Sequence, residues 1–185
     1  MSAIILDGNK IASEIRAEAA QEARALAEAG LKPGLAAVLV GQNPASEIYV
    51  RNKIKACEAL GIYSEKITPP ESVTTREMLR LVEELNARDE IDGILVQLPL
   101  PKQVDSKAVL LAVSPEKDVD GFHPVNVGRL STQRAGLVPC TPLGVIEILK
   151  RSGIEIAGAN ATVVGRSDIV GKPVEIGRAS CRERV

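Results

Sequence analysis

The chain has 185 residues, of which 45% are hydrophobic and 25% are charged, a balance typical of a globular protein. Its 23 basic and 24 acidic side chains nearly cancel and only 2% of its residues are aromatic, so we expect no nucleic-acid partner. The sequence contains no run of 18 apolar residues, so we expect no membrane-spanning helix, and the N-terminus lacks the pattern of a signal peptide. Cys57, Cys140 and Cys181 are far apart and form no C-x-x-C pair, so we expect no disulfide framework, no metal site and a cytoplasmic location.

The first half of the chain alternates short apolar runs with longer amphipathic stretches. Asp7-Gly8-Asn9 predicts a turn that caps a helix, and the segment from Thr74 to Glu77 matches a capping box that starts another. This alternation predicts an α/β fold, in which parallel strands are covered by helices on both faces. The predicted strands span 3–6, 35–40, 62–67 and 91–96, and the predicted helices span 10–29, 45–60, 74–85 and 104–112.

The second half of the chain has a different composition. Residues 114–140 are rich in glycine and proline, which predicts a connector that carries function. Thr141-Pro142 then predicts a helix to about Arg151, with Thr141 as its N-cap. An apolar run over 161–164 predicts a strand, and the glycine turn that follows indicates the start of a second α/β unit.

Tyr49 and Lys53 are the first candidate site residues. They are four residues apart on the helix predicted after strand 35–40, so they share one face near the carboxyl ends of the strands, where ligands bind in open parallel sheets. A lysine held there among apolar walls can act as an acid or a base. The alternative is a solvent-facing lysine beside a half-buried tyrosine, and the spacing alone favours it.

Gln97 lies at the carboxyl end of strand 91–96, just before the rigid segment Leu98-Pro99-Leu100-Pro101. Its side chain can reach the same crevice and hydrogen-bond Lys53, or it can cap backbone groups at the strand end. Asp118-Val119-Asp120-Gly121 predicts a tight turn with projecting carboxylates, which can accept paired hydrogen bonds from an aminopyrimidine-like edge. A solvated acidic turn is the simpler interpretation of that tetrapeptide alone.

The stretch from Val163 to Pro173 combines a predicted strand, a glycine turn and a helix, an arrangement that presents backbone N–H groups to a phosphate. Ser167 stands where the usual motif has its second glycine, and an ordinary βα turn explains the pattern equally well. Arg166 is suited to a 2′-phosphate, which would favour NADP over NAD. His123 precedes a proline in a turn region, so we assign it a structural role.

Five stretches together give the chain a specific resemblance. They are ASEIYVRNKIKACEALGI (45–62), DGILVQLPLP (92–101), PEKDVDGFHPVNVGRL (115–130), PCTPLGVIEIL (139–149) and VVGRSDIVGKPV (163–174). In this order they resemble the bifunctional methylenetetrahydrofolate dehydrogenase/cyclohydrolase family of bacterial type. The resemblance implies a three-layer folate domain over 1–118, a connector over 119–140 and the start of a Rossmann-like domain over 141–175.

The resemblance also implies an activity in one-carbon metabolism. The family oxidises 5,10-methylenetetrahydrofolate with NADP and hydrolyses the methenyl product to 10-formyltetrahydrofolate, as a homodimer. By resemblance Lys53 is the catalytic lysine, Gln97 tunes it, Tyr49 stacks on the folate rings and Asp120 anchors the pterin. The remaining implied contacts are Leu98 and Pro99 for the substrate, and Gly165, Arg166, Ser167, Gly171 and Pro173 for NADP.

The last residues depart from the family pattern. Where the family has an apolar helix, residues 175–185 read EIGRASCRERV, and the basic residues beside Cys181 predict no such helix. We interpret 176–185 as a non-native tail and expect the chain to self-associate. Two alternatives to a full enzyme stay open: a catalytically dead fragment that keeps partial ligand binding, and another two-domain NADP-dependent dehydrogenase.

Overall fold

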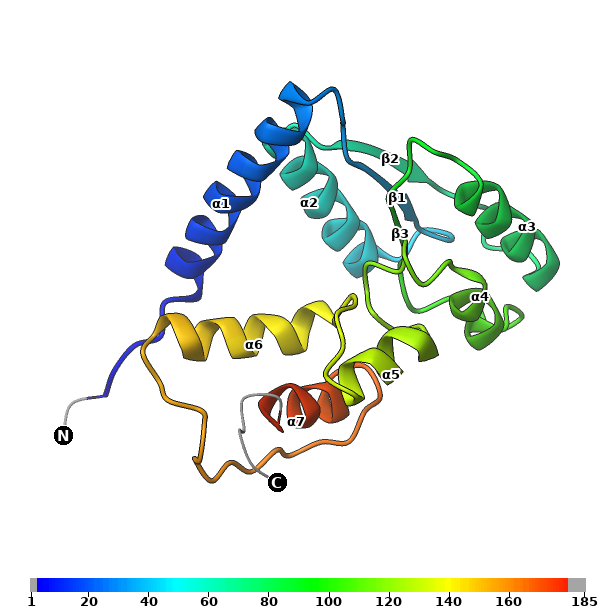
Figure 1. Cartoon of the computed structure of the whole chain (residues 1–185). Helices are drawn as coiled ribbons and strands as arrows, with labels where there is room; N and C mark the ends of the chain where they lie inside the picture. Colours follow the sequence, from blue (N-terminus) through cyan, green and yellow to red (C-terminus); the bar gives the residue numbers. More distant parts are fainter. Residues whose placement is uncertain (1–2, 180–185) are drawn as a thin grey trace. The chain divides into compact units, whose positions relative to one another are not determined.

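The computed structural model describes residues 3–179 (Figure 1). This part of the chain forms ten elements in the order α1 (Gly8–Glu28), β1 (Gly34–Val38), α2 (Pro44–Leu60), β2 (Tyr63–Ile67), α3 (Thr75–Asn86), β3 (Gly93–Val96), α4 (Ser106–Ala112), α5 (Pro124–Ser131), α6 (Cys140–Arg151) and α7 (Gly171–Ala179). They fall into two compact units. The sheet unit is Ala17–Val119, and the helical unit is Met1–Arg16 with Asp120–Val185.

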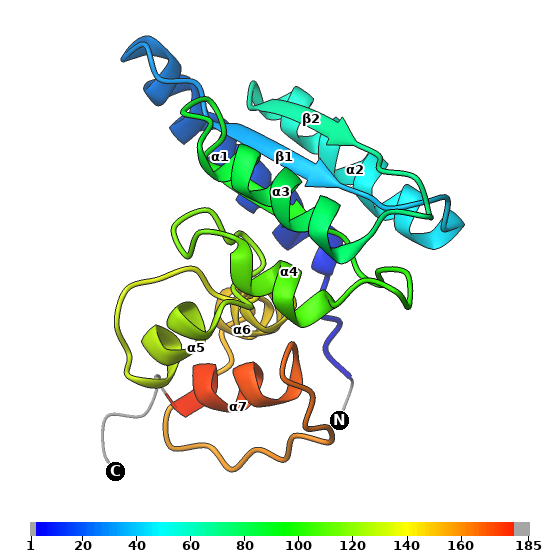
Figure 2. The same ribbon diagram turned by 90° about the vertical axis from the view of Figure 1, so that its right-hand side faces the viewer.

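The sheet unit is built on three parallel strands in the order β2-β1-β3. Alternate residues of a strand point to opposite faces, and here both faces are apolar. One face carries Ala36 and Val38 of β1 and packs against α3 and α4, while the other carries Ala37 and Leu39 and packs against α2. Figures 1 and 2 show the sheet between α2 and α3. The predicted parallel, three-layer α/β arrangement is confirmed.

Local signals fix where several helices begin and end. At α3 the Thr74 hydroxyl accepts a hydrogen bond from the Glu77 N–H, and the Glu77 carboxylate accepts one from the Thr74 N–H. These two bonds form the predicted capping box. Gly61 ends α2 with φ 77°, a left-handed conformation that glycine adopts without strain, and its N–H donates to the carbonyls of Cys57 and Glu58. At α1 the Asp7 carboxylate caps two backbone N–H groups, as predicted.

Two predicted strands are absent. Residues 3–6 and 161–164 form no strand, and the side chains of Ile4, Ile5 and Val164 are 86%, 88% and 96% exposed. An apolar run becomes a strand only where a neighbouring strand accepts its hydrogen bonds. Within residues 3–179 these runs have no such neighbour, so both predictions are wrong.

Three helix predictions also need correction. The stretch predicted as a connector rich in glycine and proline contains α5, a helix that was not predicted and that begins at Pro124. Helix α6 begins at Cys140, and its N-cap is Pro139 rather than the predicted Thr141. Thr141 therefore lies inside the first turn, and no side chain caps the helix. Helix α7 continues to Ala179 through residues predicted not to form a helix, whereas 180–185, including Cys181, lie outside the described residues.

Candidate active site

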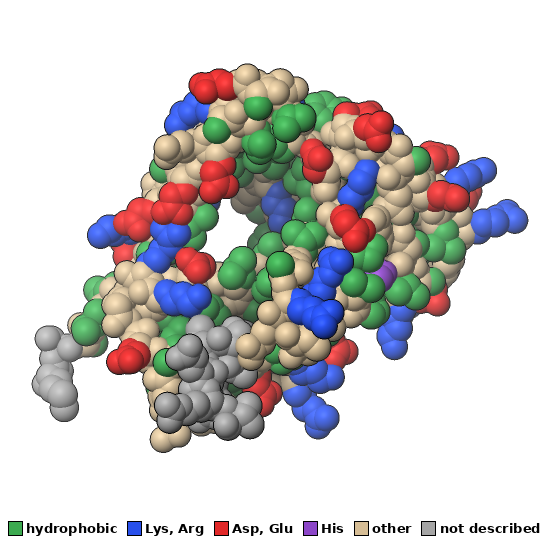
Figure 3. Space-filling model, in the orientation of Figure 1, with side chains coloured by type: hydrophobic (Ala, Val, Ile, Leu, Met, Phe, Trp, Pro, Cys, Tyr) green, Lys and Arg blue, Asp and Glu red, His purple; other side chains and the backbone are tan. Residues whose placement is uncertain are grey.

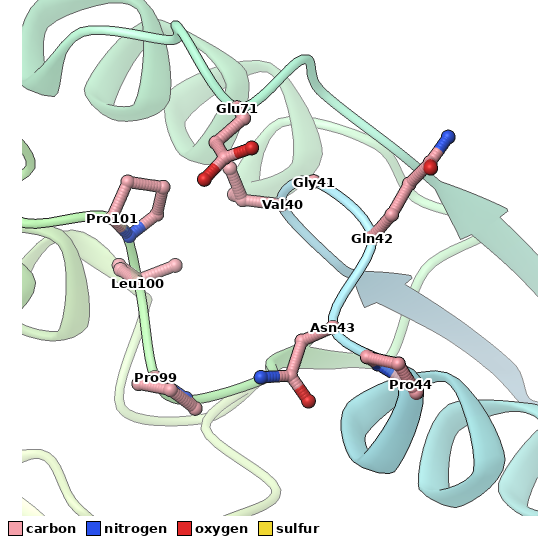
Figure 4. Close-up of a pocket in the computed structure, with 9 residues that line it drawn as sticks. All are labelled: Val40, Gly41, Gln42, Asn43, Pro44, Glu71, Pro99, Leu100 and Pro101. Carbon is pink, nitrogen blue, oxygen red and sulfur yellow. The ribbon is translucent and has the colours of Figure 1, made fainter.

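The carboxyl ends of the three strands meet at one edge of the sheet unit, where a cavity of about 350 Å³ lies. Because the strands are parallel, the loops that follow them come together there. Figure 4 shows Asn43 and Pro99 across the cavity from Glu71. The cavity is lined by Val40, Gly41, Gln42, Asn43, Pro44, Glu71, Pro99, Leu100 and Pro101.

The loop after β1 fixes the start of α2 at this edge. Gly41 has φ 68° and donates its N–H to the Pro69 carbonyl, 3.1 Å away, in the loop after β2. The Asn43 side chain then accepts a hydrogen bond from the Ser46 N–H at 3.1 Å and caps α2. The N-terminal turns of α2 are therefore held beside the cavity.

Tyr49 and Lys53 lie on the exposed face of α2. The Tyr49 side chain is 63% exposed, while its neighbour Val50 is completely buried against the sheet. Lys53 is also exposed rather than enclosed by apolar walls, and its side chain makes no hydrogen bond or ion pair with any described residue. Both side chains are therefore accessible to a ligand.

Gln97 continues β3 by one residue. Its N–H donates to the Val38 carbonyl at 2.9 Å, and its half-buried side chain donates from Nε2 to the Leu98 carbonyl at 2.8 Å. The Oε1 atom receives no hydrogen bond from the described residues. The side-chain bond predicted between Gln97 and Lys53 is thus not formed here, although Gln97 keeps an open acceptor.

The acidic turn is only partly as predicted. Asp118 does not project, because it is 5% exposed and pairs with Ile94 in a parallel bridge beside β3. Gly121 has φ 66°, and a Cβ there would lie 2.7 Å from backbone atoms of Val138 and Pro139, so only glycine fits. Asp120 is half-buried and belongs to the helical unit, and its role as the anchor of the pterin stays a prediction.

The glycine turn before α7 is exposed. A Cβ on Gly171 would lie 2.6 Å from the Gly165 carbonyl oxygen, so this glycine lets the turn approach the helix closely. The Ser167 hydroxyl accepts the N–H groups of Val170 and Gly171, both at 3.2 Å, so these donors are not presented to a phosphate as predicted. Arg166 is exposed and makes no hydrogen bond or ion pair with the described residues, so it fits an anionic ligand.

His123 has the structural role assigned to it. Its Nδ1 atom accepts the Val125 N–H at 3.2 Å and caps α5. Sequence reasoning missed Asn43 and Glu71 as cavity residues. Asn43 carried a signal, because asparagine before proline at a helix start is a common N-cap, whereas Glu71 reaches the cavity only through the tertiary fold.

The surface and the acidic groups give further limits. Figure 3 shows basic and acidic side chains intermixed on the visible face. Among residues 3–179, no cluster of three or more His, Cys, Asp or Glu side chains could hold a metal ion. In the same residues, no helix is both long and apolar enough to cross a bilayer.

Comparison with known proteins gives a consistent result for both parts of the chain. The tetrahydrofolate dehydrogenase/cyclohydrolase catalytic-domain model matches residues 6–120, and the NAD(P)-binding-domain model of the same family matches 139–178. The second match extends past Val174, into the predicted tail. Over 174 residues the chain is 71% identical to the bifunctional protein FolD of Koribacter versatilis, which is 94% of this chain and 57% of that protein.

Solved structures agree in fold. The bifunctional enzyme FolD from Campylobacter jejuni matches with a TM-score of 0.95 and 41% identity, over 98% of this chain and 64% of that one. The Trypanosoma brucei FolD, solved with NADP and an inhibitor, matches with a TM-score of 0.93 and 39% identity, over 98% and 63%. The chain thus spans about three fifths of the length of these relatives. Since the catalytic-domain model alone covers more than half of the sequence, the chain belongs to the tetrahydrofolate dehydrogenase/cyclohydrolase family.

Proposed function

We propose that the chain binds tetrahydrofolate derivatives at the carboxyl edge of its sheet. The proposed reactions are the NADP-dependent oxidation of the 5,10-methylene form and the hydrolysis of the methenyl product to 10-formyltetrahydrofolate. The observation that carries this proposal is the exposed pair Tyr49 and Lys53, on a helix whose first turn is fixed beside the cavity. The relatives named as bifunctional FolD support it.

Lys53 is the proposed catalytic residue for hydrolysis. The bridge carbon of the methenyl form lies between two nitrogens and shares a positive charge with them, so water attacks this carbon. The Lys53 amine takes a proton from that water and returns one to the nitrogen that leaves. The open Oε1 atom of Gln97 accepts a hydrogen bond from an N–H of the Lys53 amine and holds the amine in place.

The other side chains bind and orient the substrate. Tyr49 stacks on the folate ring system with its exposed ring. Leu98 and Pro99 follow Gln97 directly in the chain, and Pro99 lines the cavity. The Asp120 carboxylate accepts paired N–H bonds from the aminopyrimidine edge of the pterin, which fixes its orientation.

NADP, when bound, supplies the acceptor for the hydride that leaves the methylene carbon. Arg166 would hold its 2′-phosphate, because the guanidinium is exposed and has no protein partner among the described residues. Gly165, Ser167, Gly171 and Pro173 form the turn and the first helical residues beside it. The NADP-bound relative from Trypanosoma brucei supports this cofactor.

A second candidate function is ligand binding and hydrolysis without dehydrogenase turnover. The observation that favours it is the missing strand over 161–164, which would otherwise hold the glycine turn in place.

Exposed Ile4, Ile5 and Val164 favour self-association of the chain through apolar surface. Cys57 and Cys140 are free thiols, which supports a reducing cytoplasmic location.

The proposal is tested by the hydrolysis of 5,10-methenyltetrahydrofolate, followed by its absorbance. Replacement Lys53→Met should abolish the enzymatic rate, because methionine keeps most of the side-chain volume and removes the proton-transferring amine. Lys55→Met is the matched control, since Lys55 is another exposed lysine of α2, and its rate should stay that of the wild type. An unaltered rate for Lys53→Met would remove this lysine from the mechanism.

A further inference from the structure

The segment that leads to Asp120 is held on the sheet unit by Lys117. The Lys117 ammonium donates to the backbone carbonyls of Asn86 and Arg88, at 2.9 and 2.8 Å. These carbonyls lie at and just beyond the end of α3, where the helix leaves acceptors unsatisfied and favours a positive charge. The half-buried Lys117 thus ties its own segment to the end of α3 by two charge-assisted bonds.

Asn86 makes a second attachment at the same place. Its side-chain Nδ2 atom donates to the Ala112 carbonyl at 2.8 Å, and its Oδ1 atom accepts the Ser114 N–H at 2.9 Å. Both partners lie where α4 ends and the connector begins. We call Asn86 and Lys117 together the connector clamp.

Next to the connector clamp, the chain lies along the edge of the sheet. The Lys117 carbonyl accepts the Ile94 N–H at 2.7 Å, and Asp118 pairs with Ile94. The Val119 side chain then fills the space above Gly93, where a Cβ would lie 2.5 Å from Val119 Cγ1. The path of the backbone is therefore fixed from Ala112 to Val119, and Asp120 is the next residue.

We propose that Lys117 and Asn86 are positioning residues for the pterin-binding carboxylate of Asp120, an inference that rests on the proposed function. A carboxylate that accepts two parallel N–H bonds must be held within a fraction of an ångström of the correct place. A mobile connector would spread Asp120 over many positions, and ligand binding would then have to order it. The connector clamp fixes the backbone up to Val119 before any ligand binds.

The test compares two ligands that differ in the pterin. One is 5-formyltetrahydrofolate, which carries the pterin, and the other is p-aminobenzoylglutamate, which lacks it. Dissociation constants for the whole 185-residue chain are measured by calorimetry. Lys117→Met should raise the dissociation constant of 5-formyltetrahydrofolate about tenfold, a change that corresponds to the loss of roughly one charge-assisted hydrogen bond. The dissociation constant of p-aminobenzoylglutamate should stay within about twofold of the wild-type value.

Three further variants sharpen the test. Lys117→Arg keeps the charge and should restore most of the affinity, while Lys107→Met removes an exposed lysine of α4 and should change neither constant. Asn86→Asp replaces the donor to Ala112 and should act like Lys117→Met, which keeps the proposal testable if that variant fails to fold. An equal loss of affinity for both ligands, or none for either, would overturn the positioning role. If the wild-type chain binds neither ligand, the proposed function itself fails and the positioning role falls with it.

Discussion

The packing of α3 on the sheet leads to a prediction about Leu85. This side chain is 1% exposed and lies in the apolar cluster between α3 and the sheet face that carries Ala36 and Ile94. Replacing it with alanine removes buried carbon atoms and leaves a cavity, which should lower the free energy of unfolding by about 3 kcal/mol. With a urea m-value of roughly 2 kcal/mol/M, the unfolding midpoint should fall by about 1.5 M.

Leu111→Ala is the matched control, because Leu111 also lies one residue before the end of its helix but is 57% exposed. Its effect should stay within about 0.5 kcal/mol. Urea titrations followed by far-ultraviolet circular dichroism measure both variants, since the chain has no tryptophan to report by fluorescence. Equal destabilisation by the two replacements would refute the assignment of Leu85 to the core.

Further predictions concern a cap, a glycine and the cofactor. Hydrogen bonds from the Thr74 hydroxyl and N–H lower the pKa of Glu77, so the cap stabilises the fold above the ordinary glutamate pKa and this stability is lost as pH falls through the lowered value. Acid titrations of Glu77→Gln should show a flatter dependence of stability on pH, and an unchanged dependence would contradict this. Gly121→Ala should lower the free energy of unfolding by more than about 1 kcal/mol, whereas Gly128→Ala, with open space at its Cβ, should not; equal thermal midpoints would contradict the steric argument. Arg166→Ala should weaken the binding of NADP more than that of NAD by calorimetry, and an equal loss would mean that Arg166 does not contact the 2′-phosphate.

Elements with strong local signals could be predicted from the sequence. The capping box at Thr74 depends on residues close in the chain, and it is formed as expected. The buried strand from Gly34 to Val38 was recognisable because both of its faces are apolar. The positions of Tyr49 and Lys53 on one face of α2 followed directly from that helix.

Features that depend on distant partners could not be predicted in this way. Residues 161–164 are as apolar as a strand, but no neighbouring strand in the described part accepts their hydrogen bonds. Asp118 looked like an exposed acid, yet its pairing with Ile94 buries it. Glu71 joins the cavity only because the loop after β2 returns to the edge of the sheet.

The central claim is that tetrahydrofolate derivatives bind at the carboxyl edge of the sheet, beside α2. Nuclear magnetic resonance of the ¹⁵N-labelled 185-residue chain, titrated with 5-formyltetrahydrofolate, tests it most directly. The account predicts that the backbone amide signals of Tyr49, Lys53 and Gln97 shift with a single dissociation constant. Shifts confined to the groove between α5 and α7, which is lined by Phe122 and Ile169, with none at those three residues, would contradict it.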